Sequence, residues 1–215
     1  MNCQLYLISP PHFNLDEFQI RLEEALSAEH IPVFQLRMKT KDENGFYINP
    51  PIESELVEAA RILLPICRKY NTAFILNDNP KLAKQLGCDG VHLGSENMSV
   101  RDARKICGEN FIIGASCYAS KDLAYEAAEQ SANYVAFGQF YETKTKEAKG
   151  RPTLDLLKFW STYTTLPCVA IGGIKVDNAK PIADAGADLI AVVTGVWDYE
   201  KGPAEAVKGF VRVIS

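Results

Sequence analysis

Short apolar runs alternate with segments of helical periodicity along this chain, and that alternation restricts the fold more than any other feature of the sequence. Apolar residues recur at helical spacing in 14–28 and 53–70, for example, and predict amphipathic helices there. The apolar runs predict strands at 3–8, 32–37, 73–77, 89–93, 111–115, 133–137, 167–171 and 188–193. Because these runs are nearly continuous in apolar residues, they are typical of parallel strands buried on both faces.

Eight strand–helix units favour a closed (β/α)8 barrel, the TIM barrel, over an open doubly wound sheet of the same α/β class. An open nucleotide-binding sheet would carry a glycine-rich loop after the first strand, whereas Ser9, Pro10 and Pro11 stand there. The 215 residues leave about 27 for each unit, and a strand, a helix and two short loops need about 24. We therefore expect a single TIM-barrel domain over residues 1–215.

One local phrase occurs three times: a small residue ends a helix, Asp or Asn follows shortly, and an apolar strand begins. It reads Gly-Cys-Asp at 87–89, Ser-Ala-Asn at 131–133 and Gly-Ala-Asp at 186–188. Glycine is a common helix terminator because it readily adopts the left-handed backbone conformation. The phrase therefore predicts the same helix-to-strand junction at three places.

Composition excludes some classes of function. The formal net charge of −4 argues against a general nucleic-acid binder, and no apolar run approaches the about 18–20 residues that span a membrane. Met1 to Ser9 lacks the basic and apolar regions of a signal peptide. The six cysteines form no CxxC pair and no zinc spacing, so we expect reduced, buried thiols in a cytoplasmic protein.

The active site of such a barrel lies at the carboxyl ends of its strands, and the residues that follow the second strand suit an anion there. Gln35, Arg37 and Lys39 alternate, which would place all three on one side of an extended segment. Two cations and an amide can bind a phosphate group. A solvated basic patch is the alternative.

Asn77 and Asp78 follow the third strand. A carboxylate at a strand end can hold Mg²⁺ through oxygen ligation, which is usual where the metal also binds substrate phosphates. The alternative is that one of the two caps the next helix, a role in which Asn and Asp are common.

Two further segments could cradle phosphate. After the sixth strand, Thr143 and Thr145 project together beside Lys146, and the alternative is a solvated lysine-rich loop. Gly172 and Gly173 follow the seventh strand, and Val193 and Thr194 follow the eighth, where many barrels bind phosphate. Plain turns that end or begin helices are the alternative for this second segment.

Histidines do not suggest acid–base hydrolysis. His92 lies inside a strand and is interpreted as a core residue or as a support behind the site, while His12 and His30 look peripheral. No nucleophile–base pair is visible. Basic residues, one metal carboxylate and two phosphate cradles together favour the transfer or displacement of phosphorylated groups.

The ordered set of motifs resembles the thiamine-phosphate synthase family and its TenI-like relatives, in register with all eight predicted strands. The motifs are QLRMK at 35–39, ND at 77–78, GVHLG at 90–94, IIGAS at 112–116, TKTK at 143–146, AIGGI at 170–174 and GADLIAVVTG at 186–195. The resemblance implies a transferase that joins hydroxymethylpyrimidine diphosphate to thiazole phosphate, giving thiamine phosphate and pyrophosphate. It also implies Mg²⁺ as cofactor and a dissociative reaction, in which pyrophosphate leaves before the thiazole nitrogen attacks.

The resemblance further implies roles for individual residues. Gln35, Arg37, Lys39, Asn77, Ser116 and Lys146 would hold the pyrimidine diphosphate, while Thr143, Thr145, Gly172, Gly173, Val193 and Thr194 would hold the thiazole phosphate. Lys146, Arg37 and Ser116 would be catalytic, and Asp78 and Asn97 would bind the metal. The expected partners are these phosphorylated small molecules and, as one option, further copies of the chain.

Four positions depart from the family pattern. Ser95 and Asn97 replace a usual Gln and a second metal-binding Asp, Met38 replaces an acidic residue, and Tyr118 stands where His is common. A neutral Asn should lower the affinity for Mg²⁺. Two alternatives therefore stay open: a non-catalytic or weakly active phosphate-binding relative, and a TenI-like thiazole tautomerase. The tautomerase branch usually lacks the full TxTK motif and uses His at the position of Tyr118.

Overall fold

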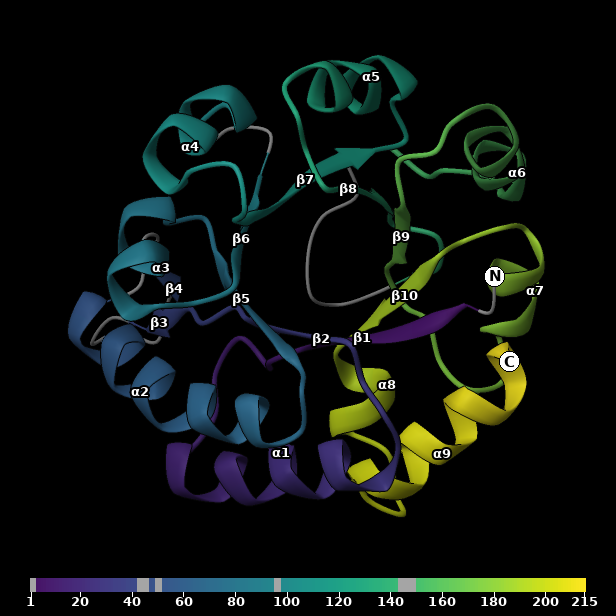
Figure 1. Ribbon diagram of the computed structural model, residues 1–215. Coiled ribbons are helices and arrows are strands. Elements are labelled where there is room, and N and C mark those ends of the chain that lie inside the picture. Colours follow the sequence, from purple (N-terminus) through teal and green to yellow (C-terminus); the bar gives the residue numbers. More distant parts are fainter. Residues whose placement is uncertain (1–2, 42–46, 49–51, 95–97, 143–149) are drawn as a thin grey trace.

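A computed structural model of the protein describes residues 3–41, 47–48, 52–94, 98–142 and 150–215, and its centre is a closed barrel of parallel strands (Figure 1). The barrel strands are β1 (Gln4–Ile8), β2 (Val33–Leu36), β5 (Ala73–Asn77), β6 (Gly90–Leu93), β7 (Ile112–Tyr118), β8 (Tyr134–Gly138), β9 (Cys168–Ile171) and β10 (Leu189–Val192). Each pairs with its neighbours in chain order, and β1 closes the ring by pairing with β10. The predicted (β/α)8 barrel and its eight strands are confirmed.

Helices surround the barrel on its outside (Figure 1). They are α1 (Leu15–Ala28), α2 (Glu53–Lys69), α3 (Pro80–Leu86), α4 (Val100–Cys107), α5 (Lys121–Glu129), α6 (Leu154–Tyr163), α7 (Lys180–Asp184), α8 (Thr194–Trp197) and α9 (Pro203–Ile214). The helix predicted for 14–28 begins one residue later, because the Asn14 side chain accepts a hydrogen bond from the Glu17 N–H and acts as its N-cap. Within the described residues, every helix is too short or too polar to cross a membrane.

Alternation along the strands divides the apolar side chains between two layers. The larger core lies between strands and helices and includes Leu5, Leu7 and Phe34. The smaller core, which fills the barrel interior, contains Tyr6, Ile8, Tyr134, Ala136, Val169 and Ala191. Because side chains alternate in direction along a strand, the residues two positions beyond these interior ones also face inward, toward the carboxyl end of the barrel.

The phrase that occurs three times in the sequence makes the same pair of hydrogen bonds each time. Asp89 accepts a bond from the Phe74 N–H through its carboxylate, at 2.7 Å, and donates its own N–H to the Phe74 carbonyl. Asp188 pairs with Cys168 in the same way, and Asn133 with the N–H and carbonyl of Ile113. The phrase therefore fastens the start of one strand to the start of its neighbour.

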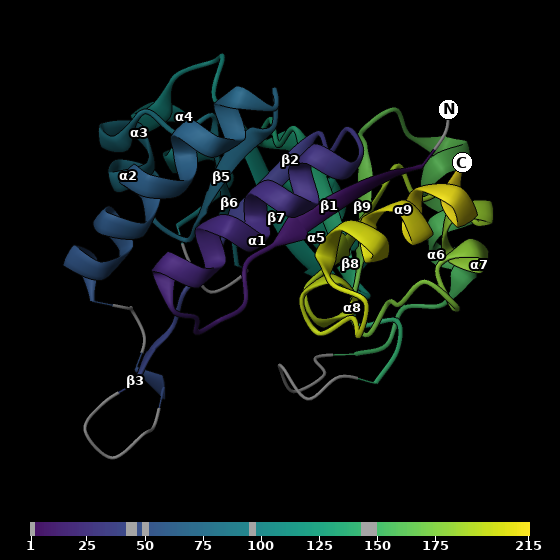
Figure 2. The same ribbon diagram turned by 90° about the horizontal axis from the view of Figure 1, so that it is seen from below.

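The polar segment after β2 contains a short antiparallel ribbon. Thr40–Lys41 (β3) pairs with Tyr47–Ile48 (β4) in an antiparallel ribbon. Figure 2 shows β3 projecting beyond one end of the barrel. Because β3 closely follows the last residue of β2, this is the carboxyl end of the strands. The ribbon lacks the apolar alternation that normally identifies a strand, so the sequence did not predict it.

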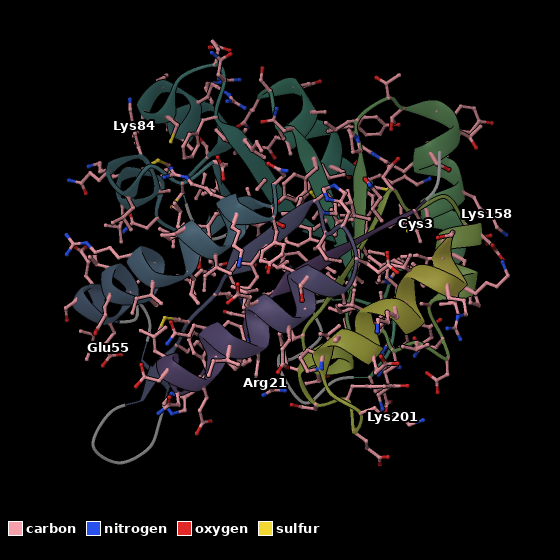
Figure 3. All side chains as sticks on the ribbon, turned by 60° about the horizontal axis from the view of Figure 1, so that its bottom comes forward. Cys3, Arg21, Glu55, Lys84, Lys158 and Lys201 are labelled. Atoms are coloured by element: carbon pink, nitrogen blue, oxygen red, sulfur yellow. The ribbon has the colours of Figure 1, made fainter. Side chains whose placement is uncertain are left out.

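Helix α8 is held at the barrel by two hydrogen bonds of Trp197. The indole Nε1–H donates to the Ile8 carbonyl at the end of β1, at 2.6 Å. Arg21 on α1 donates a guanidinium N–H to the Trp197 carbonyl, and Figure 3 labels Arg21 on the outer face of the molecule. These contacts fix the short helix that follows β10 beside the carboxyl end of β1.

The cysteines agree with the prediction of reduced, buried thiols. None of the six takes part in a disulfide, and all except the half-buried Cys107 are buried. Burial raises the pKa of the Cys117 thiol to about 12, so it stays neutral at ordinary pH.

Candidate active site

Strand alternation brings several of the predicted site residues to the inner face near the carboxyl end of the barrel. Asn77 on β5 lies opposite His92 on β6, and His92 lies opposite Gly114 on β7. Ser116 follows Gly114 by two residues and therefore shares its face. Asn77, His92 and Ser116 consequently belong to one surface although they are far apart in the sequence.

Asn77 and Asp78 form a hydrogen-bonded pair at the end of β5. The Asn77 Nδ2 donates to Asp78 Oδ2 at 2.6 Å, and the Gly94 N–H donates to Asp78 Oδ1 at 3.3 Å. Neither residue caps α3, because Asn79 accepts the Leu82 N–H in that role. The helix-cap alternative for Asn77 and Asp78 is therefore wrong.

Two residues beside this surface have left-handed backbone conformations that are uncommon for side chains other than glycine. Asp78 has φ of 64° and Tyr118, at the end of β7, has φ of 52°. The pairing of β7 with β8 also shifts register between Ser116 and Tyr118. Such local strain is concentrated at functional sites in proteins, where it aims particular side chains.

Arg37 lies directly after β2 and is half-buried. Its backbone N–H donates to Ser9 Oγ at 2.9 Å, which fixes the chain where it leaves the strand. Burial lowers the pKa of the Arg37 guanidinium, while the negative charge of Asp78 acts in the opposite direction. Arginine remains charged in proteins even so, and Arg37 and Asp78 therefore form a pair of opposite charges at this end of the barrel.

Gln35 and Lys39 occupy different surroundings from Arg37. Gln35 is only 2% exposed and donates its amide to the Tyr6 hydroxyl. Lys39 is half-buried, and its backbone N–H donates to the Pro11 carbonyl at 2.7 Å. Gln35, Arg37 and Lys39 therefore do not form one solvated basic patch, because Gln35 is enclosed in the barrel.

A chain of hydrogen bonds crosses the barrel interior and ends at Ser116. Gln35 Nε2 donates to the Tyr6 hydroxyl at 3.0 Å, and the Tyr6 and Tyr134 hydroxyls lie 2.8 Å apart. The Tyr134 hydroxyl lies 3.0 Å from His92 Nδ1, and His92 Nε2 lies 2.9 Å from Ser116 Oγ. His92 therefore supports a predicted site residue, which agrees with its interpretation as a residue behind the site.

Tyr6 and Tyr134 do not stand out in the sequence as candidate site residues. Each stands inside an apolar strand run, where an aromatic ring is normally a core residue. One feature of the sequence could have pointed to them. Each tyrosine occupies an inward-facing position of its strand, and a buried tyrosine hydroxyl needs a hydrogen-bond partner.

The glycine pair after β9 is required by close packing. Gly172 and Gly173 both have positive φ, of 109° and 65°. A Cβ on Gly172 would lie 2.7 Å from the Gln139 Cα, and one on Gly173 would lie 2.5 Å from the Glu142 carbonyl oxygen. The Tyr141 N–H also donates to the Gly172 carbonyl. These glycines therefore seat the segment that follows β8 against the end of β9.

Val193 and Thr194 lie where β10 meets α8. Val193 precedes the first turn of α8 and Thr194, which is exposed, begins it. The remaining predicted residues, Thr143, Thr145, Lys146 and Asn97, lie outside the described residues. Within the described ranges, no three His, Cys, Asp or Glu residues lie close enough together to hold a metal ion.

Comparison with known proteins decides the family. The sequence model of a family described as thiamine monophosphate synthase matches residues 5–196, which is most of the chain. The chain belongs to the thiamine monophosphate synthase family. The resemblance drawn from the motifs is therefore confirmed.

Individual members of the thiamine monophosphate synthase family match over nearly their whole length. The chain is 43% identical over 213 residues to a thiamine-phosphate synthase of Rhodospirillum centenum, covering 99% of this chain and 98% of the relative. It is 44% identical over 208 residues to a thiamine-phosphate synthase of Hyphomonas neptunium, covering 96% and 91%. These relatives are transferases, and their class is the one that the motifs predicted.

Solved structures agree with the family. A thiamine phosphate pyrophosphorylase from Pyrococcus furiosus matches with a TM-score of 0.80 and 29% identity, covering 98% of this chain and 95% of that one. A 3-hexulose-6-phosphate synthase from Salmonella typhimurium matches with a TM-score of 0.68 at 15% identity, covering 100% and 98%. The second match bears on the fold alone.

Proposed function

We propose that this thiamine monophosphate synthase family member couples hydroxymethylpyrimidine diphosphate to thiazole phosphate, releasing pyrophosphate. One observation carries the proposal: the Asn77–Asp78 pair, Arg37 and the His92–Ser116 pair converge at the carboxyl end of the barrel. Active sites of this fold occupy that end. The proposed partners are phosphorylated small molecules, and the proposed compartment is the cytoplasm.

The cations and hydroxyls of the site would stabilise the departing pyrophosphate. Negative charge grows on pyrophosphate as its bond to the pyrimidine methylene breaks, so donors fixed in advance lower the barrier. Arg37, Lys39, Ser116 and Lys146 are the proposed donors. Arg37 suits this role because its backbone is tied to Ser9 and its guanidinium is half-buried, where charge interactions are stronger than in water.

Asp78 and Asn97 are the proposed ligands for Mg²⁺. The donor chemistry fits, because Mg²⁺ prefers oxygen ligands and usually takes one or two carboxylates together with substrate phosphates. Both carboxylate oxygens of Asp78 are oriented by hydrogen bonds, from Asn77 and Gly94. Bound Mg²⁺ would neutralise charge on the diphosphate oxygens. Because Asn97 is neutral, we expect weaker Mg²⁺ binding than two carboxylates would give.

The thiazole phosphate would bind at the ends of β8, β9 and β10. Thr143, Thr145, Gly172, Gly173, Val193 and Thr194 are the proposed contacts. The packing of Gly172 and Gly173 against the segment after β8 supports this placement, since it brings two of the three strand ends together. The thiazole nitrogen would then bond to the pyrimidine methylene after the bond between that carbon and pyrophosphate has broken.

The tautomerase alternative has less support. Its branch uses a histidine at the position of Tyr118, and a phenol is a poorer general base than an imidazole. High identity to thiamine-phosphate synthases over nearly the whole chain also favours the synthase. A weakly active phosphate-binding relative is the alternative that the neutral Asn97 favours.

The deciding experiment mixes the protein with both substrates and Mg²⁺ and follows thiamine phosphate by its fluorescence after oxidation. A synthase gives product that depends on both substrates and on Mg²⁺. Absence of product at high protein concentration, together with tight binding of thiazole phosphate in calorimetry, would instead establish a binding protein. Conversion of the thiazole phosphate alone into an isomer would establish the tautomerase.

A further inference from the structure

The Tyr134 hydroxyl joins the two halves of the hydrogen-bond chain in the barrel. Tyr134 is 7% exposed, and its ring stacks on the His92 ring with 5.6 Å between centroids and 22° between planes. Within the part of the chain that the structure describes, its hydroxyl has two polar partners, the Tyr6 hydroxyl and His92 Nδ1. A phenol hydroxyl carries one proton, so it can donate to only one of these two partners.

The hydrogen bond from Gln35 determines whether the Tyr134 hydroxyl proton is donated to Tyr6 or to His92. Gln35 Nε2 can only donate, so the Tyr6 oxygen accepts there. Among the described residues, the other polar neighbour of the Tyr6 oxygen is the Tyr134 hydroxyl. If Tyr134 donated to Tyr6, the Tyr6 proton would have no acceptor although Tyr6 is 2% exposed. Because buried donors are rarely left unsatisfied, Tyr6 donates to Tyr134.

The donors and acceptors of the remaining hydrogen bonds, as far as Ser116, follow from this assignment. With its oxygen accepting from Tyr6, Tyr134 uses its own proton to donate to His92 Nδ1. Nδ1 is then the acceptor nitrogen of a neutral imidazole, and Nε2 carries the proton and donates to Ser116 Oγ. Ser116 therefore keeps its own hydroxyl proton available for a different acceptor.

The surroundings of Tyr134 hold this arrangement in place. A Cβ added to Gly114 would lie 2.0 Å from the Tyr134 ring, so β7 carries glycine where the ring crosses it. Burial raises the pKa of both tyrosine hydroxyls, which keeps their protons in place at ordinary pH. The Tyr134 ring is thus enclosed, which holds its hydroxyl beside the Tyr6 hydroxyl and His92 Nδ1.

We propose that Tyr134 is a positioning residue: by donating to His92 Nδ1 it fixes the Nε2-protonated tautomer and leaves the Ser116 hydroxyl free to donate to the leaving diphosphate. This role rests on the proposed function, because it uses Ser116 as a donor to pyrophosphate. The tautomer of His92 itself does not depend on any substrate. It can therefore be tested separately from the activity.

The first test is the nitrogen spectrum of the protein labelled with ¹⁵N-histidine, without substrates. Long-range correlations between ring protons and nitrogens distinguish a protonated Nε2 from a protonated Nδ1. His92 should be the Nε2-protonated tautomer in the native protein and should lose that preference in Tyr134→Phe. A proton on Nδ1 in the native protein would overturn the proposal. Tyr163→Phe, at a 72% exposed tyrosine on α6, is the matched control and should leave the His92 signals unchanged.

The second test is kinetic. Tyr134→Phe should lower kcat by about tenfold with KM for the pyrimidine diphosphate within about twofold, because a donor to the growing negative charge acts mainly in the transition state. In a Ser116→Ala background the same substitution should cause no further loss of kcat. An equal loss in both backgrounds would show that Tyr134 does not act through Ser116.

Tyr6→Phe tests the donor-to-acceptor direction of the hydrogen bonds separately from a general disturbance of the barrel interior. Because Tyr134 still carries a proton there, His92 should keep its Nε2-protonated tautomer and kcat should fall less than in Tyr134→Phe. A change of tautomer in Tyr6→Phe would contradict the assigned direction. If Tyr134→Phe does not fold, the spectra of the native protein and of Tyr6→Phe still show whether His92 has the proposed tautomer. A native protein that makes no thiamine phosphate would refute the proposed function, while its spectrum would still decide the tautomer.

Discussion

The Asn77 amide donates a 2.6 Å hydrogen bond to the carboxylate of Asp78, the residue next to it in the chain. The backbone of Asp78 adopts the left-handed conformation, and Asn79 rather than Asp78 is the N-cap of α3. The strand end is therefore built to present a carboxylate rather than to begin a helix.

Asp78→Asn tests this presentation of charge. The substitution keeps the shape and removes the negative charge, so we expect the Mg²⁺ concentration for half-maximal rate to rise by about tenfold or more. Titration of Mg²⁺ at fixed substrate concentrations measures it. Asp155→Asn, on the exposed surface of α6, is the control and should behave as the native enzyme. An unchanged Mg²⁺ requirement would remove Asp78 from the metal site.

Lys146→Ala tests the proposed donor in the TKTK motif. One charged donor at a developing anion is worth several kcal/mol, so kcat should fall by more than about tenfold. Steady-state assay of thiamine phosphate measures the loss. Lys158→Ala changes a lysine on α6, labelled at the outer surface in Figure 3, and should not affect kcat. Equal rates for the two variants would place the phosphate chemistry elsewhere.

The fold could be predicted because its signal is local. Each barrel strand is a short apolar run, and Gly87, which ends α3 with φ of 69°, terminates its helix as glycine usually does. The β3–β4 ribbon escaped prediction because each of its strands has only two residues, which is too few to show an alternation of apolar and polar residues.

The site could be predicted in part, for a physical reason. Charged and amide residues at strand ends, such as Arg37 and Asp78, stand out against the apolar runs that precede them. Tyr6 and Tyr134 do not stand out, because their importance comes from a hydroxyl contact between residues 128 positions apart. Such a contact is decided by barrel closure and not by local pattern.

Asp188→Ala tests the junction that occurs three times in the barrel. The variant leaves the Cys168 N–H without its 2.8 Å side-chain acceptor, so the free energy of unfolding should fall by about 1–3 kcal/mol. Asp188→Asn should lose much less, because Asn133 performs the same role with an amide oxygen. Urea unfolding of both variants measures this. Equal losses would show that charge, not the hydrogen bond, matters at the junction.

Arg104→Lys tests a side chain with several hydrogen bonds at the opposite end of the barrel. Arg104 is 9% exposed and donates to the carbonyls of Gly108, Glu109, Phe111 and Ser131 and to Asn133 Oδ1. A lysine cannot reproduce this planar fork, so the free energy of unfolding should fall by about 2–4 kcal/mol. Arg101→Lys, exposed on the same helix, should change it little. Similar urea midpoints for both variants would contradict this.

The buried thiols predict a loss of stability in alkali. Burial raises the pKa of Cys168 from its usual 9.0 to about 12, so the folded state keeps a proton that the unfolded chain releases above pH 9. This contribution is complete below pH 9 and is lost as pH rises toward 12. Between about pH 7 and pH 10, the native protein should lose about 1 kcal/mol more stability than Cys168→Ala. Equal losses in urea unfolding would contradict it.

The most direct measurement is the stoichiometry of the products in one reaction with both substrates and Mg²⁺. Thiamine phosphate is measured by fluorescence and pyrophosphate by a coupled assay, from the same samples over time. Coupling at the carboxyl end of this barrel predicts one pyrophosphate for each thiamine phosphate, and neither product in the absence of Mg²⁺. Release of pyrophosphate without thiamine phosphate would contradict this account. The absence of both products at a high concentration of enzyme would contradict it as well.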